Sequence, residues 1–193
     1  MPGVFGSFFA LLASIALLYG GNTLMGTLLP VRAGQEGFSA IFVGGMGTGY
    51  FIGFILGCQL TPWLVRRVGH IRAFAVFAAL TAVTALAYSA IFHPVAWILL
   101  RLINGFCIAG LTATIESWLN TQSSNQTRGR VLGFYMLTFY LAIASGQSLV
   151  NLADPGTPDL FMLAAALIGL VVLALTERRA AAERLRRLEA DEA

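Results

Sequence analysis

Charged side chains are scarce in this sequence. They make up 11% of the 193 residues, whereas hydrophobic residues make up 58% and the mean hydropathy is +0.79. Soluble domains carry about 25% charged residues, so this chain has too few of them to cover a surface in contact with water. The deficit excludes a soluble globular protein and predicts that lipid covers the surface instead.

Lysine is absent, and cysteine and histidine occur twice each. Cys58 and Cys107 both fall within apolar runs, where a reduced thiol behaves as a small hydrophobic group. Because His70 and His93 lack the spacing of a ligand set with them, we predict neither a disulfide nor a metal site. The basic residues are all arginines that cluster at the ends of apolar runs, which is typical of membrane topology and not of nucleic-acid binding.

Motifs for catalysis are missing as well. The apolar runs contain no pair of carboxylates, no serine or cysteine adjoins a histidine, and no glycine–lysine phosphate loop is present. We therefore expect no enzyme activity and no cofactor.

Six apolar stretches are present, each near the length of about 20 residues that crosses a bilayer. A cleaved signal peptide is the alternative for the first stretch, but residues 1–10 contain no basic side chain, so we interpret it as a mature helix. The fold class is thus an all-α membrane protein. The predicted helices span residues 4–29, 41–60, 73–92, 95–118, 131–152 and 160–175, within one transmembrane domain over residues 1–176.

The distribution of arginine predicts the orientation of these helices. Positively charged joints stay in the cytoplasm. The joints after the second and fourth stretches and the tail after the sixth are basic, so we expect both termini in the cytoplasm and a multi-pass protein of the cell (inner) membrane. Residues 177–193 predict a short charged helix, or a tail that only stops the last span. The arginines in these segments are Arg66, Arg67, Arg72, Arg128, Arg130, Arg178 and Arg179.

Glycine recurs at every fourth position of the second stretch. Such a row leaves a shallow groove on one helix face, which lets another helix approach closely where lipid provides no hydrophobic drive for association. Close helix packing is therefore expected, with a partner helix from the same chain or from another chain. This glycine row consists of Gly45, Gly49, Gly53 and Gly57.

Two charged residues fall within the predicted spans, Arg101 and Glu116, both in the fourth. A charge at the bilayer centre costs at least about 2.5 kcal/mol, so it normally faces a polar cavity or a partner. Their separation of fifteen residues is about 22 Å along a helix, too far for a pair. Arg101 can line a cavity with Asn104 one turn on, or extend to the outer headgroups.

Glu116 should have a basic neighbour, either as a static ion pair or as a latch that opens during a conformational change. Its candidate partners are Arg66, Arg67, Arg128 and Arg130. Uncharged polar residues also mark single faces of the first and fifth stretches, as links between helices or as ligand contacts. They are Tyr19, Asn22, Thr23, Tyr140 and Gln147.

Several of these segments resemble motifs of the major facilitator superfamily. The joint after the second stretch is similar to the family's G-x-x-x-D-R-x-G-R-[KR] signature, with Arg67 and Gly69 matching and Arg66 in place of Asp. That joint is Pro62-Trp-Leu-Val-Arg66-Arg67-Val-Gly69-His70-Ile-Arg72. The replacement of Asp puts the family's usual charge latch in question, and Glu116 is the alternative acidic partner.

Further matches follow in the order and topology of the family. The segment from Arg101 to Gly105 is similar to its R-x-x-x-G motif, and Arg128-Gly129-Arg130 resembles its R-G-R segment. The Ile115-Glu116-Ser117-Trp118 step and the pair Gly146-Gln147 look most like the YcaD-like branch. The fifth stretch lacks the proline of the antiporter motif, so drug–proton antiport is not supported. The resemblance implies the N-terminal six-helix half of the major facilitator fold.

Family members normally combine two such halves. The resemblance therefore implies a half-size secondary transporter that works as a parallel homodimer, since six spans insert two copies in the same orientation. The glycine row would then face Ala142 and Gly146 of the second copy. A small solute would bind Arg101, Asn104, Asn22, Tyr19, Tyr140 and Gln147, and a cytoplasmic gate would use Arg66, Arg67, Glu116, Arg128 and Arg130.

Proton coupling is a further expectation that depends on Glu116, the acidic residue within a span. Two other functions remain open. The chain can be a membrane interaction module that binds a larger partner without transporting anything, or it can be the N-terminal fragment of a twelve-helix transporter.

Overall fold

Helices form the regular structure of this protein in the computed structural model, which describes residues 2–171. Five helices are long and apolar enough to cross a membrane, and a shorter apolar helix follows them. This confirms the predicted six-helix fold; the predicted charged helix over 177–193 lies outside the described residues. The elements are α1 (Pro2–Gln35), α2 (Ala40–Val68), α3 (His70–Ala90), α4 (Pro94–Gln122), α5 (Arg128–Ser148), the 3-10 turn η1 (Leu149–Leu152) and the final helix Asp159–Val171.

Two helices continue through prolines that lie just beyond the predicted spans 4–29 and 41–60. α1 runs through Pro30 and α2 through Pro62, and both rings lie on exposed helix faces. α2 then turns into α3 at a single residue, Gly69, whose φ of 85° is a conformation that glycine adopts without steric cost. The joint predicted between the second and third spans is therefore helical on both sides of this glycine.

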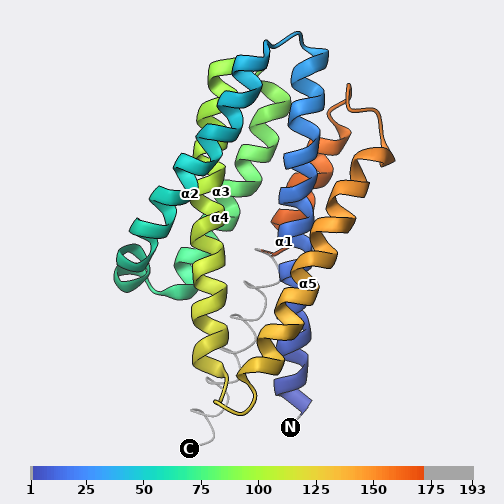
Figure 1. Ribbon diagram of the computed structural model, residues 1–193. Coiled ribbons are helices and arrows are strands. Elements are labelled where there is room, and N and C mark those ends of the chain that lie inside the picture. Colours follow the sequence, from blue (N-terminus) through green and yellow to red (C-terminus); the bar gives the residue numbers. More distant parts are fainter. Residues whose placement is uncertain (1, 172–193) are drawn as a thin grey trace, which may run out of the picture.

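α1 and α4 occupy the centre of the bundle. α2 packs along α4 and α5 packs along α1, while α3 lies against α4 and the final helix lies against α1. Figure 1 shows α3 behind α4 and the final helix behind α1, with α2 and α5 at the two sides. α2 and α3 thus both pack on α4, and α5 and the final helix both pack on α1. The two halves of the bundle therefore repeat one arrangement.

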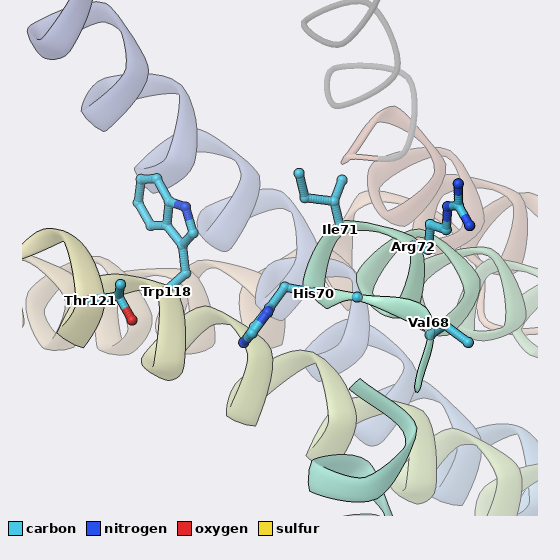
Figure 2. A pocket seen from close by; sticks show the side chains of 7 residues that line it. Val68, His70, Ile71, Arg72, Trp118 and Thr121 are labelled. Atoms are coloured by element: carbon cyan, nitrogen blue, oxygen red, sulfur yellow. The ribbon is translucent and has the colours of Figure 1, made fainter. Parts of the chain in front are cut away.

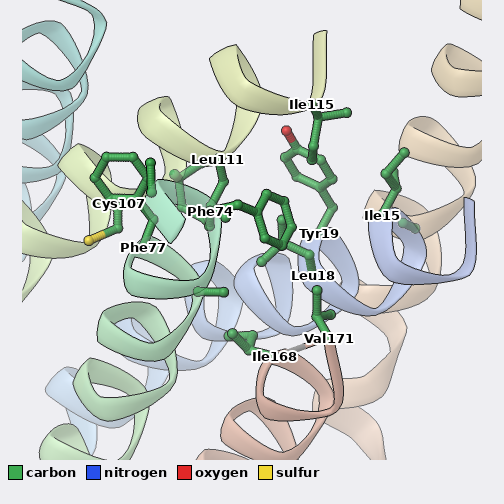
Figure 3. Packing of buried hydrophobic residues seen from close by; sticks show 14 of the residues in the cluster. Ile15, Leu18, Tyr19, Phe74, Phe77, Cys107, Leu111, Ile115, Ile168 and Val171 are labelled. Atoms are coloured by element: carbon green, nitrogen blue, oxygen red, sulfur yellow. The ribbon is translucent and has the colours of Figure 1, made fainter. Parts of the chain in front are cut away.

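The core lies where α1, α3, α4 and the final helix meet. Figure 3 shows Leu18, Phe77, Leu111 and Ile168, one from each of these helices, gathered in one cluster of buried apolar side chains. A second cluster surrounds Trp97 nearer the α3–α4 joint. α2 and α5 contribute little to either cluster, so most of their surface stays exposed.

The glycine row packs against α4 of the same chain. A Cβ atom at Gly57 would lie 2.6 Å from the carbonyl oxygen of Phe106, and one at Gly53 would clash with the carbonyl oxygen of Leu102. The expected close packing is therefore present. The prediction that the row faces a second copy is wrong, because the backbone of α4 already fills the groove.

Ala142 and Gly146 are likewise used within the chain. Both are buried, and a Cβ atom at Gly146 would lie 2.5 Å from the carbonyl oxygen of Gly20 in α1. The predicted contact of these two residues with a second copy is wrong for the same reason. Small residues here bring α5 onto α1, as the glycine row brings α2 onto α4.

Candidate functional site

Arg101 lies in α4 and is directed toward α1 and α2. A Cβ atom on Gly26 of α1 would lie 3.8 Å from its Nη2, and its Cζ lies over the ring of Tyr50 in α2, 5.2 Å from the centroid. Its Nη1 donates a long hydrogen bond of 3.5 Å to Oδ1 of Asn104, one turn further along α4. These contacts hold the guanidinium against neighbouring helices and favour the inward orientation over extension to the headgroups.

Three polar atoms around Arg101 are buried without a hydrogen-bond partner in the described part of the chain. They are Nε of Arg101, Oδ1 of Asn22 and the hydroxyl of Tyr88. The charge of Arg101 acts on both Tyr50 and Tyr88, and the hydroxyl of Tyr50 interacts with the Asn22 side chain. A buried polar atom left unpaired costs about 1–3 kcal/mol, so this is an expensive arrangement for a structural element.

We call Arg101, Asn104, Asn22, Tyr50 and Tyr88 the Arg101 cluster. The structure brings together three residues that the sequence singled out and two that it missed. Tyr50 and Tyr88 carry the same signal that marked Tyr19, a phenol hydroxyl inside an apolar span, but no motif or spacing connected them with Arg101.

Tyr19 belongs to a different layer of the bundle. Its hydroxyl makes a 2.6 Å hydrogen bond with Oγ1 of Thr112, and it also interacts with Tyr135. Thr112 is eleven residues from Arg101, about 16 Å along α4. The hydroxyl of Tyr19 is therefore hydrogen-bonded at a later turn of α4 than Arg101, while its ring remains within electrostatic reach of Tyr50, and its part in a solute site stays a prediction.

Glu116 lies in that second layer with Tyr19. The hydroxyl of Tyr135, on α5, donates to its Oε1 at 3.3 Å. The expected ion pair with a basic residue is absent within residues 2–171, where the ion pair present is that of Arg32 with Glu36. Arg67 instead lies over the ring of Trp63, 4.5 Å from the centroid.

The gate predicted from these charges is therefore not assembled in this structure. The continuation of α2 as a helix keeps Arg66 and Arg67 on the exposed surface, and Arg128 and Arg130 are exposed at the start of α5. The partner of Glu116 in this structure is Tyr135, whereas the sequence predicted an arginine.

Tyr140 and Gln147 are exposed on α5 and do not meet the Arg101 cluster within this chain. Tyr140 is 65% exposed, and its ring contacts Phe139 with the centroids 5.4 Å apart. Their part in a solute site therefore depends on a second unit.

Arg32 joins three segments that are distant in the sequence. It forms a 2.7 Å ion pair with Glu36, donates to the carbonyl oxygens of Pro155 and Gly156, and lies over the ring of Phe92. The end of α1 is thus fastened to the α3–α4 joint and to the loop before the final helix.

A pocket of about 350 Å³ lies at the opposite end of α4 from Arg101. Figure 2 shows it between His70 and Arg72 at the start of α3 and Trp118 and Thr121 on α4. Trp118 is seventeen residues from Arg101, about 26 Å along the helix. This pocket is distinct from the Arg101 cluster, which forms one polar wall between α1, α2, α3 and α4.

The chain matches a known protein family. Residues 11–192 match the model described as Major Facilitator Superfamily. The chain is also similar to proteins described as "Uncharacterized MFS-type transporter YcaD" from Escherichia coli O45:K1 (strain S88 / ExPEC), O81 (strain ED1a) and O6:K15:H31 (strain 536 / UPEC). Each is 28% identical over 141 residues, which cover 73% of this chain and 37% of the relative's length. No solved structure matches.

Proposed function

Because the chain belongs to the Major Facilitator Superfamily, we propose that it is one six-helix half of a secondary transporter that moves a small polar solute by alternating access. The observation that carries this proposal is the Arg101 cluster. Charged residues inside a span are costly and are retained where they serve a solute or ion pathway. Unpaired polar atoms beside Arg101 support a role in binding.

A second six-helix unit would complete the site. α2 and α5 are much less buried than the central helices. Over the most apolar 18 residues of each helix, 22% are buried in α2 and 17% in α5, against 50% in α1 and in α4. The uncovered faces carry large apolar side chains: Phe51 and Ile55 on α2, and Leu137 and Leu141 on α5. We propose that a second copy in the same orientation packs against these faces, so that α2 of each copy meets α5 of the other.

A second copy would also give Tyr140 and Gln147 a place in the solute site. Tyr140 and Gln147, exposed on α5, would reach the space that the two copies enclose beside Arg101 and Asn104. The arginine-rich ends at the α2–α3 turn and the start of α5 favour a cytoplasmic location for that side, with both termini in the cytoplasm of a cell (inner) membrane. Transport would then follow from rocking of one unit against the other.

Disulfide crosslinking tests the second copy directly. In a Cys58→Ser background, Ile55→Cys combined with Leu141→Cys should give crosslinked dimers in native membranes, because these positions lie near the middle of α2 and α5. The matched control combines Ile55→Cys with Val83→Cys, since Val83 is 60% exposed on α3 behind α4. Equal crosslinking of the control pair, or none in either, would contradict the proposed interface.

The second candidate function is association with a six-helix partner of different sequence, and the length of the relatives supports it. The match covers 37% of the length of these curated relatives, so the complementary unit can differ in sequence from this one. A chain that stays monomeric in lipid but associates with a different six-helix segment would support either an interaction module or a fragment of a twelve-helix transporter. Liposome uptake by the chain alone would contradict both.

A further inference from the structure

The guanidinium of Arg101 has no anionic partner in the described part of the chain. Arginine remains charged in proteins, so this charge needs compensation inside the span. The ring of Tyr50 and the amide of Asn104 provide only partial compensation, because neither carries a negative charge. A negative charge from outside this polar wall would complete the compensation.

Each of the four acidic residues within residues 2–171 is engaged elsewhere. Glu36 pairs with Arg32, and Glu116 accepts a hydrogen bond from Tyr135. Asp154 lies in the loop before the final helix and accepts from the amide of Gly156, and Asp159, the first residue of that helix, accepts from the hydroxyl of Thr157. Within residues 2–171, a second copy would bring these same four acidic residues, engaged in the same contacts.

The unpaired atoms specify the chemistry that fits beside Arg101. A guanidinium presents several donors in a planar fork that matches the two oxygens of a carboxylate. Oδ1 of Asn22 is an acceptor without a donor, and the hydroxyl of Tyr88 is a further unpaired group near Arg101. A ligand with a carboxylate and a neighbouring hydroxyl or amino group would satisfy both sides of this wall.

We propose that the solute is a small organic anion, whose carboxylate is bound by Arg101 and whose hydroxyl or amino group donates to Oδ1 of Asn22. This inference rests on the proposed transport function and narrows its solute class. A neutral sugar or amide could satisfy the hydrogen bonds but would leave the charge of Arg101 uncompensated. A hydrophobic drug would leave both the charge and the unpaired polar atoms as they are.

Binding to the full chain in lipid nanodiscs tests the solute class without requiring transport. The probes are lactate, propionate and lactamide, which differ in the carboxylate and the hydroxyl, together with other carboxylates of two to six carbons and their amides. Carboxylates should bind better than the matching amides, and lactate better than propionate. Thermal shifts that show no carboxylate preference across this set would overturn the proposal.

Three variants assign the two contacts. Arg101→Gln should remove the preference for carboxylates, whereas Arg101→Lys should keep it with binding weakened about tenfold, because the charge stays and the fork is lost. Asn22→Ala should remove only the preference for lactate over propionate. Size-exclusion profiles matching the wild type confirm that each variant is folded, and a carboxylate preference retained by folded Arg101→Gln refutes the site.

The outcomes separate this inference from the proposed function. Carboxylate binding that depends on Arg101, with no uptake into liposomes, would support the anion site and contradict transport. Uptake of neutral solutes that survives Arg101→Gln would support transport and contradict the anion site.

Discussion

The contact between α2 and α4 yields a graded prediction for the glycine row. A Cβ atom at Gly57 would lie 2.6 Å from the carbonyl oxygen of Phe106, so the helices would have to separate by 0.8 Å to reach an ordinary contact of 3.4 Å. The same atom at Gly49 would lie 2.9 Å from the carbonyl oxygen of Ile98 and needs less movement. The expected order of damage by alanine is Gly53, then Gly57, then Gly49.

The size of the effect follows from the rigidity of the obstacle. A backbone carbonyl cannot rotate away as a side chain can, so overpacking should cost about 1–3 kcal/mol, near the upper end for Gly53→Ala. The matched control is Gly47→Ala on the other face of α2, where a Cβ atom would meet nothing within 4 Å. This change should be neutral or slightly stabilising, because alanine favours helix by about 1 kcal/mol over glycine.

Thiol labelling measures these effects in the folded bundle. Cys107 is fully buried in the core beside α3, whereas Cys58 is exposed, so a Cys58→Ser background reports on Cys107 alone. A loss of one to two kcal/mol should accelerate labelling by about 5–30-fold. Labelling of Gly53→Ala at the wild-type rate, or equal acceleration in Gly47→Ala, would falsify the packing assignment.

Two further predictions concern the charged groups outside the Arg101 cluster. Arg32→Ala should destabilise the chain by about 1–3 kcal/mol, because the carbonyl acceptors lose a charged donor. The control Arg72→Ala, at an exposed position, should leave the midpoint of thermal unfolding unchanged. Similar midpoints for the two variants would contradict the role of Arg32. Glu116→Gln should abolish uptake driven by a pH gradient and preserve solute exchange, since glutamine keeps an acceptor for Tyr135 but releases no proton. Tyr135→Phe, which keeps the carboxylate, should retain gradient-driven uptake, and wild-type coupling in Glu116→Gln would exclude this carboxylate as the proton site.

The membrane class, the six helices and the family were all predictable from the sequence. Apolar runs of about 20 residues must form helices in lipid, because each backbone group has to be hydrogen-bonded within the segment itself. This constraint is local, so composition along the chain is enough to satisfy it. The helix ends were less predictable: α2 continues past Pro62 and turns at Gly69, since the ring faces outward and one glycine with positive φ makes the turn.

The partners of individual residues were decided by the tertiary structure. The glycine row predicts that another backbone comes close, but its sequence carries no information about which one, and the fold supplies α4 of the same chain. Tyr19 likewise fits a polar face of α1 in the sequence, yet it meets Thr112 and not Arg101. The rotation and slope of each helix determine such pairings, and these depend on all the side chains packed between the helices together. The sequence alone therefore determined that a charged residue stands inside a span, and the fold decided that Arg101 lies among unpaired polar atoms while the acidic residues of the described chain are engaged elsewhere.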